Sequence, residues 1–218
     1  MQLPATRDDT AYLRMHRCVY GVLRWIVEET SAGRPVDNGL AANRLGDLWE
    51  NTGPKGHPYE TLYRSAADQL IARAVAHTLG QRGRTSQPDW TLTLSHGRVT
   101  FTPDHVEIID DNGIVTVVVQ RMRTGRPSLN ESGKPIYGLY HAAAESEHPG
   151  ANPRVEIAYL STETIEVVST KPKTVASKVE KYERALIGIL RGDFRATPDD
   201  FVCPRCAHYF ICPCAEDT

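Results

Sequence analysis

Cysteine is the residue type that most clearly marks chemistry in this chain. Four of the five cysteines stand in the last sixteen residues, as Cys203-x2-Cys206-x5-Cys212 with Cys214 just beyond. A two-residue spacer lets two sulfurs face one centre, so three thiolates this close favour a metal ion or an iron–sulfur cluster. The remaining cysteine, Cys18, is the simplest fourth ligand. The spacing therefore predicts a centre that joins the first helix to the tail.

A structural zinc site is the alternative. It would use Cys203, Cys206 and Cys212 with either Cys214 or His208 as the fourth ligand. Zinc ribbons usually carry two paired knuckles, and a distant lone cysteine does not fit that pattern. A disulfide framework is disfavoured, because the cysteine count is odd and the spacing is crowded at one end.

The elements that position these residues follow from the hydrophobic periodicity. We expect a helical first part (residues 1–85), a sheet core (86–170) and a closing helix with a Cys-rich tail (171–218), together forming one domain. Asn112-Gly113 is a strong hairpin turn, and the strands around it are expected to form an antiparallel meander. The expected helices are Thr10–Ala32, Leu40–Glu50, Tyr59–Leu79, Ile136–Ser146 and Thr174–Leu190, and the expected strands are Trp90–Leu94, Arg98–Phe101, His105–Ile109, Ile114–Gln120, Val155–Leu160 and Ile165–Val168.

Composition limits the classes of function. With 218 residues and a formal net charge of -2, the chain can bury one substantial core, and a nucleic-acid site would have to be a local basic patch. No stretch approaches the roughly 20 apolar residues that span a bilayer. We therefore expect a cytoplasmic protein without a membrane partner. No Gly-x4-Gly-Lys-Ser/Thr loop is present, so ATP hydrolysis by that route is not expected.

The cysteine pattern resembles that of the iron–sulfur branch of the RecB-like PD-(D/E)XK nucleases, and the likeness covers most of the chain. Cys18 followed by Tyr20 matches the N-terminal element of that family. The tail, from Arg191-Gly192-Asp193-Phe194 to Tyr209-Phe210-Ile211-Cys212-Pro213, is most similar to members linked to UvrD-type helicases. The resemblance implies an α/β fold with a central mixed sheet flanked by helices, and a 4Fe-4S cluster on Cys18, Cys203, Cys206 and Cys212.

Members of this family bind Mg²⁺ or Mn²⁺ with an aspartate on one core strand and an acid-x-lysine on its hairpin partner, often followed by Thr-Gly. Asp104 fits the first acid. If Thr124-Gly125 is the Thr-Gly pair, Arg121 stands at the second acid and Arg123 at the lysine. A guanidinium cannot ligate a metal ion but binds phosphate oxygens well.

Two further family positions also differ. The early Gly-x-x-His motif would fall in Leu45–Glu50, which holds no histidine, and the glutamine four residues before Tyr140 is replaced by Ile136. His57 is expected to be a surface loop residue. The nuclease centre therefore looks degenerate.

Our leading hypothesis is a non-catalytic, nuclease-like domain that binds single-stranded or junction DNA through Arg121, Arg123 and Arg126. A UvrD-type helicase, in cis or in trans, is the expected partner in DNA repair, recombination or defence. The alternatives are an active Mg²⁺- or Mn²⁺-dependent DNA exonuclease and a purely structural or protein-docking domain. The exonuclease would be of the RecB-like or CRISPR-adaptation type, and its site would combine Asp104 with Glu107, Asp110 or Gln120. In an interpretation without a functional site, Asp104 is only a turn residue and the arginines form a solvated face.

Overall fold

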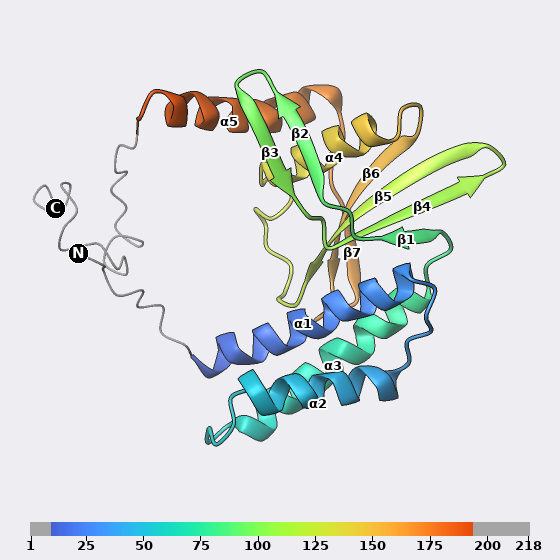
Figure 1. Cartoon of the computed structure of the whole chain (residues 1–218), viewed down its shortest axis with the longest axis vertical. Coiled ribbons are helices and arrows are strands. Elements are labelled where there is room, and N and C mark those ends of the chain that lie inside the picture. The colour runs from blue at the N-terminus through green and yellow to red at the C-terminus, as the bar shows by residue number, and fades with distance from the viewer. Residues whose placement is uncertain (1–9, 194–218) are drawn as a thin grey trace, which may run out of the picture.

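The computed structural model describes residues 10–193. Within this range the chain is a mixed α/β protein, with five helices, a five-stranded mixed sheet and a separate two-stranded sheet. Figure 1 shows three helices on one side of the larger sheet, and the other two helices with the small sheet on its other side. The predicted helices are confirmed to within two residues at each end. In this range no helix is long and apolar enough to cross a membrane.

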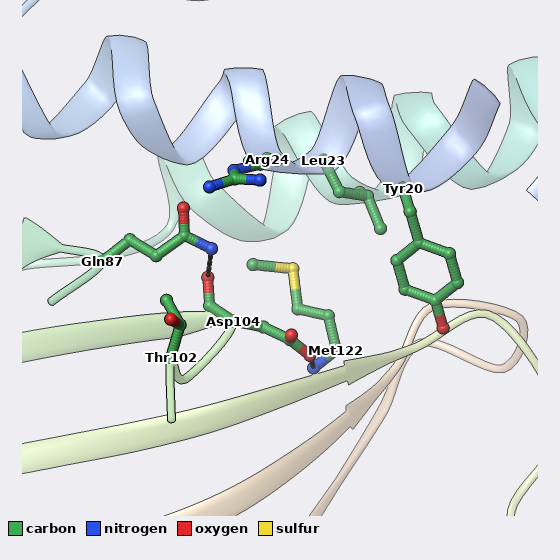
Figure 2. Close-up of a pocket in the computed structure, with 7 residues that line it drawn as sticks. All are labelled: Tyr20, Leu23, Arg24, Gln87, Thr102, Asp104 and Met122. Atoms are coloured by element: carbon green, nitrogen blue, oxygen red, sulfur yellow. Dashed lines mark hydrogen bonds between the residues drawn. The ribbon is translucent and has the colours of Figure 1, made fainter. Parts of the chain in front are cut away.

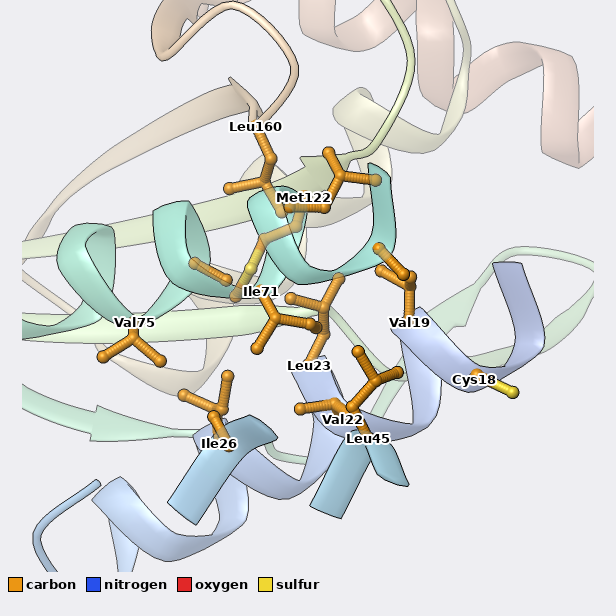
Figure 3. Packing of buried hydrophobic residues seen from close by; sticks show 14 of the residues in the cluster. Cys18, Val19, Val22, Leu23, Ile26, Leu45, Ile71, Val75, Met122 and Leu160 are labelled. Atoms are coloured by element: carbon orange, nitrogen blue, oxygen red, sulfur yellow. The ribbon is translucent and has the colours of Figure 1, made fainter. Parts of the chain in front are cut away.

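The first three helices form a bundle that packs on one face of the sheet. Capping side chains set the starts of the first two, since the Thr10 hydroxyl accepts a hydrogen bond from Leu13 N and the Asp37 carboxylate accepts one from Leu40 N. Figure 3 shows side chains from α1, α2 and α3 meeting Met122 and Leu160 from the sheet region. The three helices are α1 (Ala11–Ser31), α2 (Asn38–Thr52) and α3 (Glu60–Leu79).

The larger sheet has the strand order β1-β4-β5-β6-β7. Only β5 and β6 run parallel, because helix α4 (Ile136–Glu147) forms the crossover between them. A second core lies between this sheet, α4 and Trp90. The strands are β1 (Arg84–Ser86), β4 (His105–Asp111), β5 (Ile114–Arg123), β6 (Asn152–Tyr159) and β7 (Thr164–Val167).

The turn between β4 and β5 is the one that the sequence predicts. Asn112 and Gly113 both have positive φ, at 53° and 86°, and the Asp110 carboxylate accepts a hydrogen bond from Gly113 N. The turn fixes the pairing of the two strands, with His105 opposite Gln120. This register brings the start of β4 to the end of β5, where the candidate site lies.

The predicted meander is wrong in part. Strands β2 (Trp90–Leu94) and β3 (Gly97–Phe101) form a sheet of their own, and β3 does not pair with β4. Pro103 between them has no N–H and ends the ladder. The edge position beside β4 is taken instead by β1, a strand of three residues that is too short to give a periodic signal.

The last described helix, α5 (Pro172–Leu190), packs against α4 and closes the structure on that side. The two helices approach closely at Gly138, where a Cβ would lie 2.5 Å from Lys178 Cβ. The Glu183 carboxylate on α5 accepts hydrogen bonds from Ser95 N and from the His96 ring, which fastens the β2–β3 turn to the helix. The small sheet is thereby held over α4 and α5.

Candidate functional site

Asp104 and Arg121 meet at the junction of β4 and β5. Asp104 immediately precedes β4, and its Oδ1 accepts a hydrogen bond from Arg121 Nη1 at 3.1 Å. Its other oxygen, Oδ2, accepts one from the backbone N–H of Met122 at 2.8 Å. Two positions that the sequence assigns to one site are therefore in contact.

This ion pair is half buried, with 24% of the Asp104 side chain and 34% of the Arg121 side chain exposed. Burial raises the pKa of Asp104, although the charge of Arg121 and the Met122 N–H oppose it. Burial would lower the pKa of Arg121, but the Asp104 carboxylate and the Tyr140 hydroxyl raise it overall. Loss of solvation thus offsets much of the attraction within the pair.

Arg123 lies two residues after Arg121 on β5. Its guanidinium approaches the carboxylate of Glu131, which the sequence did not single out. Its Nη2 is 3.6 Å from Glu131 Oε2, and the same carboxylate accepts hydrogen bonds from Lys134 Nζ at 2.6 Å and Tyr137 OH at 2.8 Å. Burial works against ionisation of Glu131, but these partners outweigh it, so its pKa is lowered. The sequence gives no signal for Glu131, which stands alone in the polar loop between β5 and α4.

Arg126 lies in the same loop and is exposed. Just before it, Thr124 is buried, and its hydroxyl lies 3.1 Å from Nδ1 of His16 on α1. The Thr124-Gly125 pair therefore joins the end of β5 to the first helix. Arg121, Arg123 and Arg126 lie along one stretch of chain, and the first two are half-buried whereas Arg126 is exposed.

A cavity of about 250 Å³ opens beside Asp104. Figure 2 shows Tyr20, Leu23 and Arg24 of α1 on one wall and Asp104 and Met122 on the other. Gln87 and Thr102 complete the lining, and the Gln87 amide donates a hydrogen bond to the Asp104 carbonyl at 3.4 Å. The lining of the cavity therefore combines apolar and polar side chains.

The side chains proposed to complete an irregular metal site with Asp104 have other hydrogen-bond partners. Glu107 accepts hydrogen bonds from the backbone N–H groups of Arg82 and Gly83, and Asp110 belongs to the hairpin turn. Gln120 is bonded to His77 and Glu156. Within residues 10–193, no group of three or more His, Cys, Asp or Glu side chains is arranged to hold a metal ion.

Trp49 stands where a histidine would complete the early Gly-x-x-His motif with Gly46. It is 3% exposed, and its indole N–H donates to Glu60 Oε1 at 3.0 Å. Arg64 lies over the ring, 5.3 Å from its centroid. This position is therefore part of the packing among α2 and α3. His57 accepts a hydrogen bond from Tyr59 N in the loop between these helices, as expected of a loop residue.

Cys18 is buried between α1 and α2. Its sulfur lies 3.6 Å from the Leu48 carbonyl and 3.3 Å from the hydroxyl of Thr52, whose side chain is exposed. In Figure 3 the sulfur points away from the other labelled side chains. Within residues 10–193 the thiol forms no disulfide, and its side chain is 0% exposed at the edge of the first core cluster. Cys203, Cys206, Cys212 and Cys214, with His208, lie outside the described residues.

No family model matches the chain, and no curated protein matches it in a sequence search. The contacts around Asp104, together with the motifs of the sequence, therefore carry the functional argument.

Proposed function

We propose that this chain is a PD-(D/E)XK-type, RecB-like nuclease domain that has exchanged its metal site for arginines and binds DNA without cutting it. The contact between Asp104 and Arg121 is the observation that carries the proposal. In the family that the chain resembles, the first acid and the acid-x-lysine lie on hairpin partners, and here Asp104 immediately precedes β4 and Arg121 lies on its hairpin partner β5.

The chemistry of this pair argues for binding rather than cleavage. A divalent ion needs carboxylate oxygens on more than one side, whereas here Asp104 faces a guanidinium that repels a cation at close range. The positive charge of Arg121 takes the place next to Asp104 that a metal ion would need. The site keeps its charge complementarity and loses the group that would activate a water molecule.

The stretch from 121 to 134 has a surplus of positive charge. Arg121, Arg123, Arg126 and Lys134 contribute four cations against the two carboxylates Asp104 and Glu131. Arg126 is exposed and Arg123 keeps 33% of its side chain exposed, so both can reach a phosphate. One guanidinium group can donate two parallel hydrogen bonds to the oxygens of a phosphate. Such contacts suit a DNA backbone, because they do not depend on the base sequence.

The first prediction concerns these two arginines. Replacing both, as Arg123→Gln with Arg126→Gln, should weaken binding of single-stranded DNA about tenfold at moderate salt, because two phosphate contacts are lost. The slope of log K against log salt should become shallower by about 1.4. Fluorescence anisotropy over a salt series measures both effects. The matched control, Arg82→Gln with Arg98→Gln, removes the same charge from two exposed positions elsewhere and should change neither.

Three outcomes would overturn this proposal. If the unaltered protein fails to bind single-stranded or junction DNA even at low salt, it has no DNA site here. If Mg²⁺- or Mn²⁺-dependent cleavage is found and disappears in Asp104→Asn, the domain is an enzyme. If the arginine variants bind as the unaltered protein does, the domain is better described as a structural or protein-docking module.

A 4Fe-4S cluster held by Cys18, Cys203, Cys206 and Cys212 is part of the proposal. It is supported by the cysteine spacing and by the place of Cys18 next to an exposed threonine. The cluster would staple the two ends of the chain, and its role would be structural. The similarity of the tail to family members linked to UvrD-type helicases supports such a helicase, in cis or in trans, as the partner.

The second prediction tests the cluster. Protein purified without oxygen should hold about four iron atoms per chain and absorb visible light. Cys18→Ser should lose most of the iron, whereas Cys214→Ser, at the cysteine that the proposal leaves spare, should keep it. Zinc in place of iron, or full iron content in Cys18→Ser, would contradict this assignment.

A further inference from the structure

Four residues of α1 form a continuous ridge beside the candidate site. Tyr12, His16, Tyr20 and Arg24 are spaced four residues apart, so their side chains lie in one row along the helix. The Tyr12 and His16 ring centroids are 4.2 Å apart, and those of His16 and Tyr20 are 6.2 Å apart. We call these three rings and Arg24 the α1 ridge.

Within the described residues, the rings of the α1 ridge remain accessible to solvent. Tyr12 is 53% exposed and Tyr20 is 37% exposed, which is unusual for two tyrosines that flank a third ring. His16 is held in place by Thr124, and burial lowers its pKa, so the ring is neutral at pH 7. Single exposed aromatics need no explanation, but a row of contacting rings is a stacking surface.

The ridge leads directly to the charged site. Tyr20, with Arg24, lines the cavity beside Asp104, as Figure 2 shows, and the Tyr20 hydroxyl is close enough to Arg121 to affect its pKa. Thr124 contacts His16 of the ridge, whereas Arg123, the residue before it, directs its guanidinium to Glu131 in the loop before α4. The aromatic rings of the ridge thus lie beside the cations Arg24 and Arg121. The ion pair of Arg24 with Glu28 is exposed and weak, so Arg24 can turn to a phosphate.

The form of DNA matters for stacking on these rings. The faces of bases in a duplex are covered by their stacked neighbours, so the exposed rings of the ridge cannot stack on them. An extended single strand, by contrast, can place one base on each ring.

We infer that the α1 ridge is a base-stacking platform for single-stranded DNA, with the bases on Tyr12, His16 and Tyr20 and the phosphates toward Arg24 and Arg121. This inference rests on the proposed function and names the form of DNA that the site takes. The strand runs along α1 and passes the cavity beside Asp104. Stacking on tyrosine depends little on which base is present, so binding tolerates any sequence.

The test compares an oligothymidine strand with a strand of equal length that lacks bases, both labelled for fluorescence anisotropy. The unaltered protein should bind the thymidine strand at least about tenfold more tightly than the baseless strand, and more tightly than a duplex. Tyr12→Ala and Tyr20→Ala should each weaken binding of the thymidine strand about tenfold, and neither should change binding of the baseless strand. Tyr20→Phe keeps the ring and should bind as the unaltered protein does.

Tyr59→Ala is the matched control, because Tyr59 is 62% exposed and lies outside the ridge. It should leave both affinities unchanged. Equal binding of the two strands by the unaltered protein, or unchanged binding in the two alanine variants, would overturn the inference and leave phosphate binding by Arg123 and Arg126 intact. Failure of both strands to bind would overturn the inference together with the proposed function.

Discussion

Replacing Asp104 by alanine should destabilise the folded protein by about 3 kcal/mol. The change leaves the half-buried guanidinium of Arg121 without its carboxylate and the Met122 N–H without its acceptor. Breaking a buried pair from one side costs about 3–5 kcal/mol, and the partial exposure of both side chains places the loss at the lower end. Urea unfolding followed by circular dichroism measures it.

The double variant Asp104→Asn with Arg121→Gln is the informative comparison. It removes both charges while leaving an amide oxygen for the Met122 N–H, so it should lie within about 1 kcal/mol of the unaltered protein. The raised pKa of Asp104 supports this expectation, because burial already opposes the charged form. A double variant as unstable as Asp104→Ala would show that the two side chains act separately rather than as a pair.

Acid should destabilise the protein between pH 6.5 and pH 4 through His105. This side chain is 0% exposed, and burial, with the nearby His77, lowers its pKa from 6.5 to about 4. Below pH 6.5 the unfolded chain binds a proton that the folded state cannot accept, so stability falls as the pH falls. The loss should approach about 3 kcal/mol near pH 4.

His105→Gln removes this titration while keeping a polar side chain for Gln81, which now contacts His105 Nδ1 at 3.2 Å. The stability of this variant should vary much less with pH over the same interval. His16, which is less buried and has a lowered pKa, serves as a comparison. His16→Gln should reduce the pH dependence of stability less than His105→Gln does. If His105→Gln retains the full acid loss, another group is responsible for it.

Several features were predictable because they depend on neighbours in the sequence. The helices follow from apolar spacing and from caps such as Thr10 and Asp37, and Asn112-Gly113 specifies its own turn. Once this turn is fixed, the pairing of β4 with β5 follows. The resemblance to the family's motif assigns Asp104 and Arg121 to one site, and the β4–β5 hairpin brings them into contact.

Other features depend on which faces meet, and no local pattern encodes them. The approach of Glu131 to Arg123, the burial of His105 and Lys178, and the separation of β2 and β3 from the main sheet all require elements distant in sequence to pack first. The α1 ridge was equally hidden, because i, i+4 aromatics are ordinary in a helix until Thr124 and Asp104 are placed beside them. The sequence by itself determined the helices, every strand except β1, the β4–β5 turn and the motif positions. Only the tertiary structure decided which side chains share an environment, since burial, pairing and charge are set by contacts across the chain.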